Sequence, residues 1–136
     1  MNVGMVTGEF NSEITSVMEA HAIKKAGKLG INVVKAVKVP GSFDMPIMVK
    51  KLLERNDIDA VIALGAIIKG GTKHDEVIGF AIAAKLADLS TEFNKPVALG
   101  IIGPGATWEQ AEERAEEYAE RALIAAIKLV EEIENL

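Results

Sequence analysis

The residues best suited to chemistry lie in the stretch GGTKHD, residues 70–75, which directly follows an apolar run. Adjacent glycines let backbone N–H groups approach a ligand closely, and Thr72 adds a hydroxyl group. If a helix begins at this point, its N-terminus favours a bound anion. We therefore expect Gly71 and Thr72 to bind a phosphate group, with an ordinary glycine-rich turn as the alternative. The spacing differs from the GxxxxGK(S/T) loop of nucleoside triphosphatases.

His74 follows this loop and is one of only two histidines in the chain. An imidazole can accept and donate a proton near neutral pH. Because it stands beside an expected anion site, we expect His74 to transfer protons; a histidine of a surface loop is the alternative. Asp75 is a candidate for orienting its ring. The other histidine, His21, falls on the apolar stripe of an expected helix, where packing is the favoured interpretation.

Two arginines near the C-terminus, Arg114 and Arg121, are seven residues apart and share one face of the expected last helix. Either guanidinium could bind an anion in a site shared between subunits. Glu117 stands four residues before Arg121, so an ordinary surface ion pair is the alternative. Spacing by itself favours neither arginine.

Phenylalanines mark two further loops, with Phe10 after the first expected strand and Phe43 after the second. An aromatic ring at the mouth of a site could stack on a planar heterocycle, and core anchoring is the alternative. Ser42 and Asp44 flank Phe43 and could form hydrogen bonds with a polyol or a ring edge. Asp44 could instead cap the following helix.

Hydrophobic patterning places all these loops at one edge of a sheet. Apolar segments of strand length alternate with segments of helical period, which predicts a single α/β domain, residues 1–136, built as a three-layer αβα sandwich on a four-stranded parallel sheet. Ligands of such sheets bind beyond the carboxyl ends of the strands. The expected strands are residues 2–6, 31–39, 59–68 and 96–102, and the expected helices are 12–27, 44–55, 75–93 and a long one that begins after a Thr107–Gln110 capping box.

Composition excludes several classes of function. The chain has no cysteine, and its two histidines are far apart, so neither thiolate nor histidine metal spacing is present. The net charge of −5 argues against a nucleic-acid surface. No apolar run approaches the roughly 18 residues of a membrane helix. We expect a cytoplasmic protein that works without a metal or cofactor and has neither a nucleic-acid nor a membrane partner.

Two helical segments, residues 77–87 and 122–130, are apolar around most of their circumference. A helix of this kind is usually buried on more than one side. In a domain this small, the second side is expected to face another subunit. The alternative is that alanine is used here simply as a good helix former. We favour a homo-oligomer.

Five segments, in order along the whole chain, resemble lumazine synthase, a family of riboflavin biosynthesis, and most of all its short archaeal branch. They are EFNSEIT (9–15), VPGSFDMP (39–46), GAIIKGGTKHDEV (65–77), FNKPVALGI (93–101) and TWEQAEERA (107–115). The resemblance implies a flavodoxin-like sheet and pentamers that often assemble into sixty-subunit icosahedral shells. It also implies condensation of 5-amino-6-(D-ribitylamino)uracil with 3,4-dihydroxy-2-butanone 4-phosphate to 6,7-dimethyl-8-ribityllumazine, without metal or organic cofactor.

The resemblance also implies roles for single residues. His74 matches the proton-transfer histidine of the family, and the family usually carries Glu where Asp44 stands. The other matches are Gly71, Thr72 and Arg114 for the phosphate, Phe10 for stacking on the pyrimidine, Ser42, Phe43, Asp44, Ala66, Ile67 and Ile68 for the ring and ribityl chain, and Leu99 and Arg121 for contact from the adjacent subunit.

Two other functions fit the same residues. One is a self-assembling shell or engineered cage component on this fold with little or no catalysis, because the uniform segment GFAIAA (79–84) and the Ala/Glu-rich last helix suit a redesigned surface. The other is a flavin- or nucleotide-binding module of flavodoxin type, the weakest candidate because acidic or aromatic flavin loops are missing. The catalytic reading is favoured because Thr72, His74 and Arg114 are all present.

Overall fold

A computed structural model describes all residues, 1–136, and its strands and helices alternate along the chain. The predicted order of elements is confirmed, with boundaries that differ by a few residues. The elements are β1 (Asn2–Gly8), α1 (Ser12–Lys28), β2 (Asn32–Val39), a 3-10 turn η1 (Ser42–Asp44), α2 (Met45–Leu53), β3 (Ala60–Ile68), α3 (His74–Phe93), β4 (Val97–Ala106) and α4 (Trp108–Glu134).

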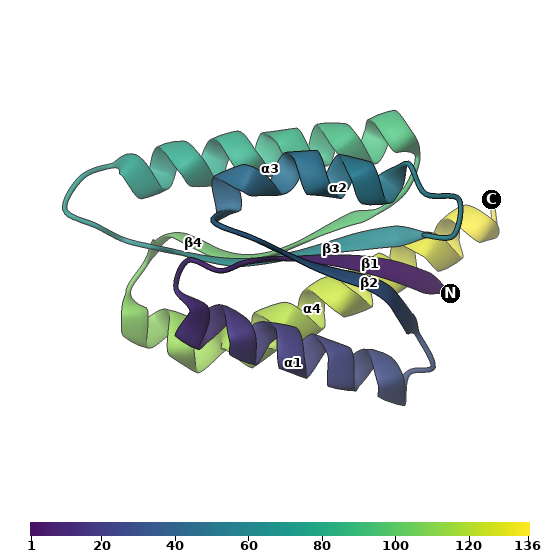
Figure 1. The fold of residues 1–136 in the computed structure, drawn as a ribbon, viewed down its shortest axis with the longest axis horizontal. Helices are drawn as coiled ribbons and strands as arrows, with labels where there is room; N and C mark the ends of the chain where they lie inside the picture. The colour runs from purple at the N-terminus through teal and green to yellow at the C-terminus, as the bar shows by residue number, and fades with distance from the viewer.

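The four strands form one parallel sheet in the order β2-β1-β3-β4. Helices α2 and α3 cover one face and α1 and α4 cover the other, so the predicted three-layer α/β class is confirmed (Figure 1). The continuous apolar sequence of β3 fits its central place, because a strand between two helical layers is buried on both faces. The carboxyl ends of the strands all lie at the same end of the sheet, on the left of Figure 1.

Each face of the sheet has its own hydrophobic core. One core joins the sheet to α1 and α4 and includes Met5, Ile62 and Leu123, whereas the other joins it to α2 and α3. Helix α4 contributes a stripe of buried alanines that lets it lie close to the sheet. At Gly100 of β4, a Cβ atom would stand 3.0 Å from the Cβ of Ala122, so both small residues are needed for this approach.

Strand β4 departs from the prediction in two ways. The sequence predicts a strand over residues 96–102, yet β4 extends to Ala106, because pairing with β3 shifts register between Ala66 and Ile68 and resumes at Ala106. Its apolar sequence is also not buried throughout: β4 is an edge strand, and Leu99 is 53% exposed. The extended end of β4 packs beside the site described below.

Large apolar side chains remain exposed on the two helices predicted to have surplus apolar surface. Val77 and Phe80 of α3 are 64% and 66% exposed, and Ile124 and Leu129 of α4 are about half exposed. This surface is not covered within a single chain. No helix is long and apolar enough to cross a lipid bilayer.

Candidate functional site

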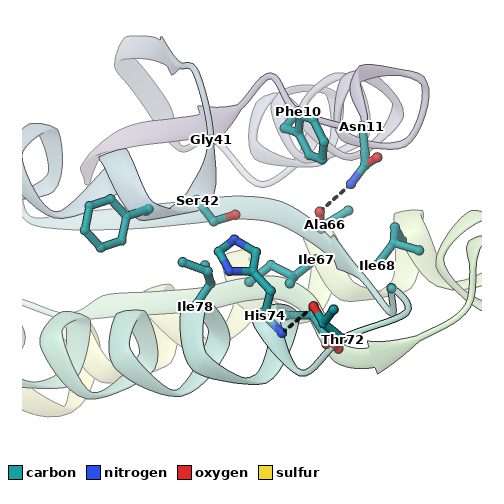
Figure 2. Close-up of a pocket in the computed structure, with 13 residues that line it drawn as sticks. Phe10, Asn11, Gly41, Ser42, Ala66, Ile67, Ile68, Thr72, His74 and Ile78 are labelled. Carbon is teal, nitrogen blue, oxygen red and sulfur yellow. Dashed lines mark hydrogen bonds between the residues drawn. The ribbon is translucent and has the colours of Figure 1, made fainter.

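A cavity of about 400 Å³ opens at the carboxyl ends of β1 and β3. The β1–α1 turn, the η1 turn, the end of β3 and the start of α3 all contribute to its wall, as Figure 2 shows. Its position is the one that parallel α/β sheets use for ligands. The lining residues are Phe10, Asn11, Gly41, Ser42, Phe43, Ala66, Ile67, Ile68, Gly70, Thr72, His74, Asp75 and Ile78.

Most of the residues predicted from sequence to form a site meet in this pocket, although they come from three separate segments. Phe10 comes from the first loop, Ser42 and Phe43 from the second, and Thr72 and His74 from the third, with Ala66, Ile67 and Ile68 at the base. Five predicted residues do not line it: Asp44, Gly71, Leu99, Arg114 and Arg121.

The β1–α1 turn is fixed to its neighbours on both sides. Asn11 adopts a left-handed conformation, with φ of 65°, and its side-chain amide donates a hydrogen bond of 2.8 Å to the carbonyl of Ala66. The N–H of Phe10 donates to the carbonyl of Pro40 at 2.9 Å. These bonds hold the 73% exposed ring of Phe10 at the mouth of the pocket, between two strand ends.

The η1 turn brings Ser42 against the central strand. A Cβ atom at Gly65 would stand 2.8 Å from the Oγ of Ser42, so the missing side chain of Gly65 makes room for this hydroxyl. The carboxylate of Asp44 accepts a hydrogen bond from the N–H of Gly41 at 3.0 Å. The alternative that Asp44 caps the next helix with its side chain is wrong, because this carboxylate turns back into its own turn and outside the pocket.

The predicted phosphate loop connects β3 to α3, and α3 begins at His74. The N–H of Lys69 donates to the carbonyl of Ala106 at 2.7 Å, and the N–H of His74 donates to the Oγ of Thr72 at 3.3 Å. Gly70 and Gly71 have open space around them, so the backbone here is accessible to a ligand. The ring of His74 points from the start of α3 into the pocket, toward Ser42 (Figure 2).

Asp75 does not orient the ring of His74, contrary to one expectation. It is 93% buried, since only 7% of it is exposed, and its carboxylate accepts a hydrogen bond from the N–H of Gly105 at 3.0 Å. Adjacent residues of a helix point in different directions, and Asp75 faces the end of β4. No group of three His, Cys, Asp or Glu side chains is arranged to hold a metal ion.

The arginines and Leu99 lie elsewhere on the surface. Arg114 lines a separate hollow of about 200 Å³, formed with the end of β4 and with Gln110 and Tyr118. Arg121 stands 3.7 Å from the carboxylate of Glu117 and 5.7 Å from the centre of the Tyr118 ring. A single chain therefore does not bring these residues to His74, and the lining of its pocket includes no lysine or arginine.

His21 is partly buried between α1 and α4 and lies outside the pocket, which agrees with its expected packing role, and its ring contacts acidic side chains. Its ring stands between Glu116 and Glu120 of α4, at 3.6 and 3.5 Å, with 26% of the side chain exposed. Hydrogen bonding and charge from Lys25, followed by those from His21, hold the pKa of Glu120 below its ordinary value. This cluster links α1 to α4 on the far side of the sheet from α3.

Sequence reasoning missed several pocket residues, and two had a signal that could have identified them. Asn11 directly follows Phe10 in the same strand-end loop, where asparagine readily takes a left-handed conformation. Ile78 stands four residues after His74, so both lie on one face of α3. Gly70 belongs to the glycine pair that the sequence did mark, whereas the place of Gly41 in the pocket depends on how the loops meet.

Comparison with known proteins gives one consistent result. The family model for 6,7-dimethyl-8-ribityllumazine synthase matches residues 1–134. A protein of that name from Saccharolobus solfataricus is 57% identical over 136 residues, covering 100% of this chain and 88% of the relative. Proteins of the same name from Saccharolobus islandicus and Metallosphaera sedula are 59% and 53% identical, covering 96% and 100% of this chain and 85% and 90% of the relatives. These names favour an enzyme over a non-catalytic assembly component.

Proposed function

The chain belongs to the 6,7-dimethyl-8-ribityllumazine synthase family, and we propose that the pocket around His74 is its active site. The reaction is the condensation of 5-amino-6-(D-ribitylamino)uracil with 3,4-dihydroxy-2-butanone 4-phosphate, which releases phosphate and water in riboflavin biosynthesis. The observation that carries this assignment is the His74 ring, which points into an apolar pocket whose mouth holds the exposed ring of Phe10. A planar heterocycle and a proton-transfer group can therefore meet there.

The pyrimidine would lie in the part of the pocket between Phe10 and the end of β3. An aromatic ring at the mouth can stack on the heterocycle. The hydroxyl of Ser42 and the backbone groups of residues 66–68 can form hydrogen bonds with its polar edge and with the ribityl chain. Asp44 lies outside the cavity, so its contact with the ribityl hydroxyls would require the chain of that substrate to extend past Phe43.

The phosphate would lie over residues 70–72, where the start of α3 directs backbone N–H groups outward. The amine of the pyrimidine attacks the substrate carbonyl and forms an imine with loss of water. Removal of a proton from the butanone carbon then allows phosphate to leave, and attack of the second nitrogen closes the ring with loss of another water. Each step moves a proton, so His74 acts as acid and base, and positioning supplies the remaining acceleration.

We further propose that a second copy of the chain completes the site. A phosphate dianion is normally neutralised by cationic side chains, and the pocket of one chain is lined by none except His74. Arg114 lies in a different hollow, and Leu99 is exposed on the edge strand. Because the two surfaces differ, copies that join them make a head-to-tail contact, and such a contact forms a ring when its rotation closes. A pentamer is the expected ring, and the exposed apolar side chains of α3 suit its contacts.

The test measures formation of the lumazine product above the spontaneous background. His74→Ala should lower kcat by roughly 10²- to 10⁴-fold. Arg114→Ala should mainly raise the KM of the phosphate substrate. His21→Ala is the matched control, since that histidine lies outside the pocket, and it should keep the wild-type rate.

Mixing the two variants, at a concentration of the phosphate substrate too low for either variant alone to show turnover, tests whether the site is shared. When subunits reassemble at random in a ring, about a quarter of the pockets combine an intact His74 with an intact Arg114 from the next copy. We expect about a quarter of the wild-type rate in the mixture. A mixture that stays inactive would exclude the shared site. Absence of turnover by assembled wild-type protein would exclude the proposed function itself.

A further inference from the structure

Asp75 is the one charged side chain among the buried residues of this chain. A buried carboxylate is costly unless it is well hydrogen bonded. It also lines the pocket in which we place a phosphate, and a carboxylate repels that group. Asp75 is therefore unsuited to binding the phosphate itself, and its position calls for another role.

The hydrogen bond of Asp75 is one of two that connect the phosphate loop to the end of β4. At the far end of the loop, the carboxylate of Asp75 accepts from the N–H of Gly105 at 3.0 Å. At the near end, the N–H of Lys69 donates to the carbonyl of Ala106 at 2.7 Å. The loop, residues 70–74, thus forms an arch whose two ends rest on two adjacent residues.

The arch has little internal support. Nothing lies within 4 Å of the Cβ positions of Gly70 and Gly71, and Thr72 and His74 are both exposed. One internal hydrogen bond, from the N–H of His74 to the Oγ of Thr72, spans 3.3 Å. The shape of the arch is therefore set by its ends.

The end of β4 on which the arch rests packs tightly against α3. A Cβ atom at Gly79 would stand 2.6 Å from the Cδ of Pro104, so Pro104 lies directly on α3. Gly79 is four residues after Asp75, and both face the end of β4. One face of the first turns of α3 is thus built to hold residues 104 and 105.

We propose that Asp75 is a positioning residue for the phosphate loop. Its carboxylate fixes the start of α3 to Gly105, and so holds Thr72, His74 and the free N–H groups of the arch in the geometry that binds the phosphate substrate. The bond from the N–H of Gly105 to the Asp75 side chain attaches the far end of the glycine-rich loop. This inference rests on the proposed function and deepens it.

Steady-state kinetics with both substrates test the proposal. Asp75→Ala removes the acceptor and should raise the KM of the phosphate substrate about tenfold, with a small effect on the KM of the pyrimidine. Asp75→Asn keeps an oxygen that can accept from Gly105 and should restore this KM to within about twofold of the wild type. Glu76→Ala is the matched control, because it also removes an acidic residue from the first turn of α3 and should leave both KM values unchanged.

Amide hydrogen exchange supplies a readout that is independent of turnover. The N–H of Lys69 is untouched by the substitution, yet its exchange should accelerate in Asp75→Ala and remain slow in Asp75→Asn if both ends hold one arch. Equal rises in the two KM values, or loss of thermal stability with unchanged KM values, would overturn the positioning role. If wild-type protein has no turnover, the proposed function fails, and unchanged Lys69 exchange in Asp75→Ala would separately overturn the inference.

Discussion

Substitution of Gly103 by alanine tests whether the turn at the end of β4 is held against the pocket. Gly103 has a φ of +95°, and a Cβ atom there would stand 2.1 Å from the backbone oxygen of Ile67. Gly105, two residues later, has a similar φ of +89°, but nothing lies within 4 Å of its Cβ position. The two alanine variants therefore share the backbone strain and differ in the steric contact.

The expected magnitudes follow from this difference. Left-handed φ values cost an alanine about 1–2 kcal/mol, so Gly105→Ala should lose that amount of stability. In Gly103→Ala the methyl must move about 1 Å or more from the oxygen to reach an ordinary C···O separation. Displacing β3 or the turn by that distance should add about 2–3 kcal/mol. The total for Gly103→Ala is then roughly 3–5 kcal/mol.

Thermal unfolding at matched protein concentration measures both variants. For a chain of this length each kcal/mol lowers Tm by about 3–4 °C, which predicts a loss of about 5 °C for Gly105→Ala and about 14 °C for Gly103→Ala. Matched concentration matters because assembly raises Tm by mass action. Equal Tm values for the two variants would refute the reasoning, since they would mean that the turn moves away from Ile67 at no cost.

Two further predictions concern the pocket and the α1–α4 cluster. Gly65→Ala places a methyl 2.8 Å from the Oγ of Ser42 and 3.0 Å from the Cε of the buried Met45. Both are terminal atoms of side chains that must shift, so stability should fall by about 1–2 kcal/mol, while the KM of the pyrimidine rises about tenfold. Steady-state kinetics check this, and an unchanged KM would mean that Ser42 does not contact the pyrimidine. Because Lys25 and His21 lower the pKa of Glu120, its contribution to stability is present above its ordinary pKa of 4.5 and is lost as the pH falls through the lower folded value. Glu120→Gln should therefore flatten the acid side of the stability profile, as measured by urea unfolding between about pH 3 and 6, and a parallel profile would contradict the assignment.

The order of elements could be predicted from the sequence because each signal is local. The continuous apolar run of β3 identifies a central strand, and the Thr107–Gln110 capping box places the start of α4, where the Thr107 side chain accepts from the N–H of Gln110 at 3.2 Å. The loop that carries Thr72 and His74 was evident from its residue types and its place after a strand. Residue composition and hydrophobic period are local properties, so strands and helices can be predicted from them without knowing which distant residues are in contact.

Other features depend on contacts between distant parts of the chain and could not be predicted in this way. Strand β4 continues past Gly103 because pairing with β3 resumes at Ala106. His21 faces Glu116 and Glu120, which are 95 and 99 positions later in the chain, because α1 and α4 share one face of the sheet. Its position on the apolar stripe of α1 carried no information about which residues of α4 would stand opposite.

The sequence by itself determined the α/β class, the strand ends at which a ligand binds and the residue types available there. Tertiary structure alone decided which of those residues share a pocket: His74 joins Phe10 and Ser42, whereas Arg114 lies in a separate hollow and Asp75 holds Gly105. The physical reason is that periodicity and propensity act over a few residues. The distance between two side chains depends on how the strands pair and how the helices pack on the sheet.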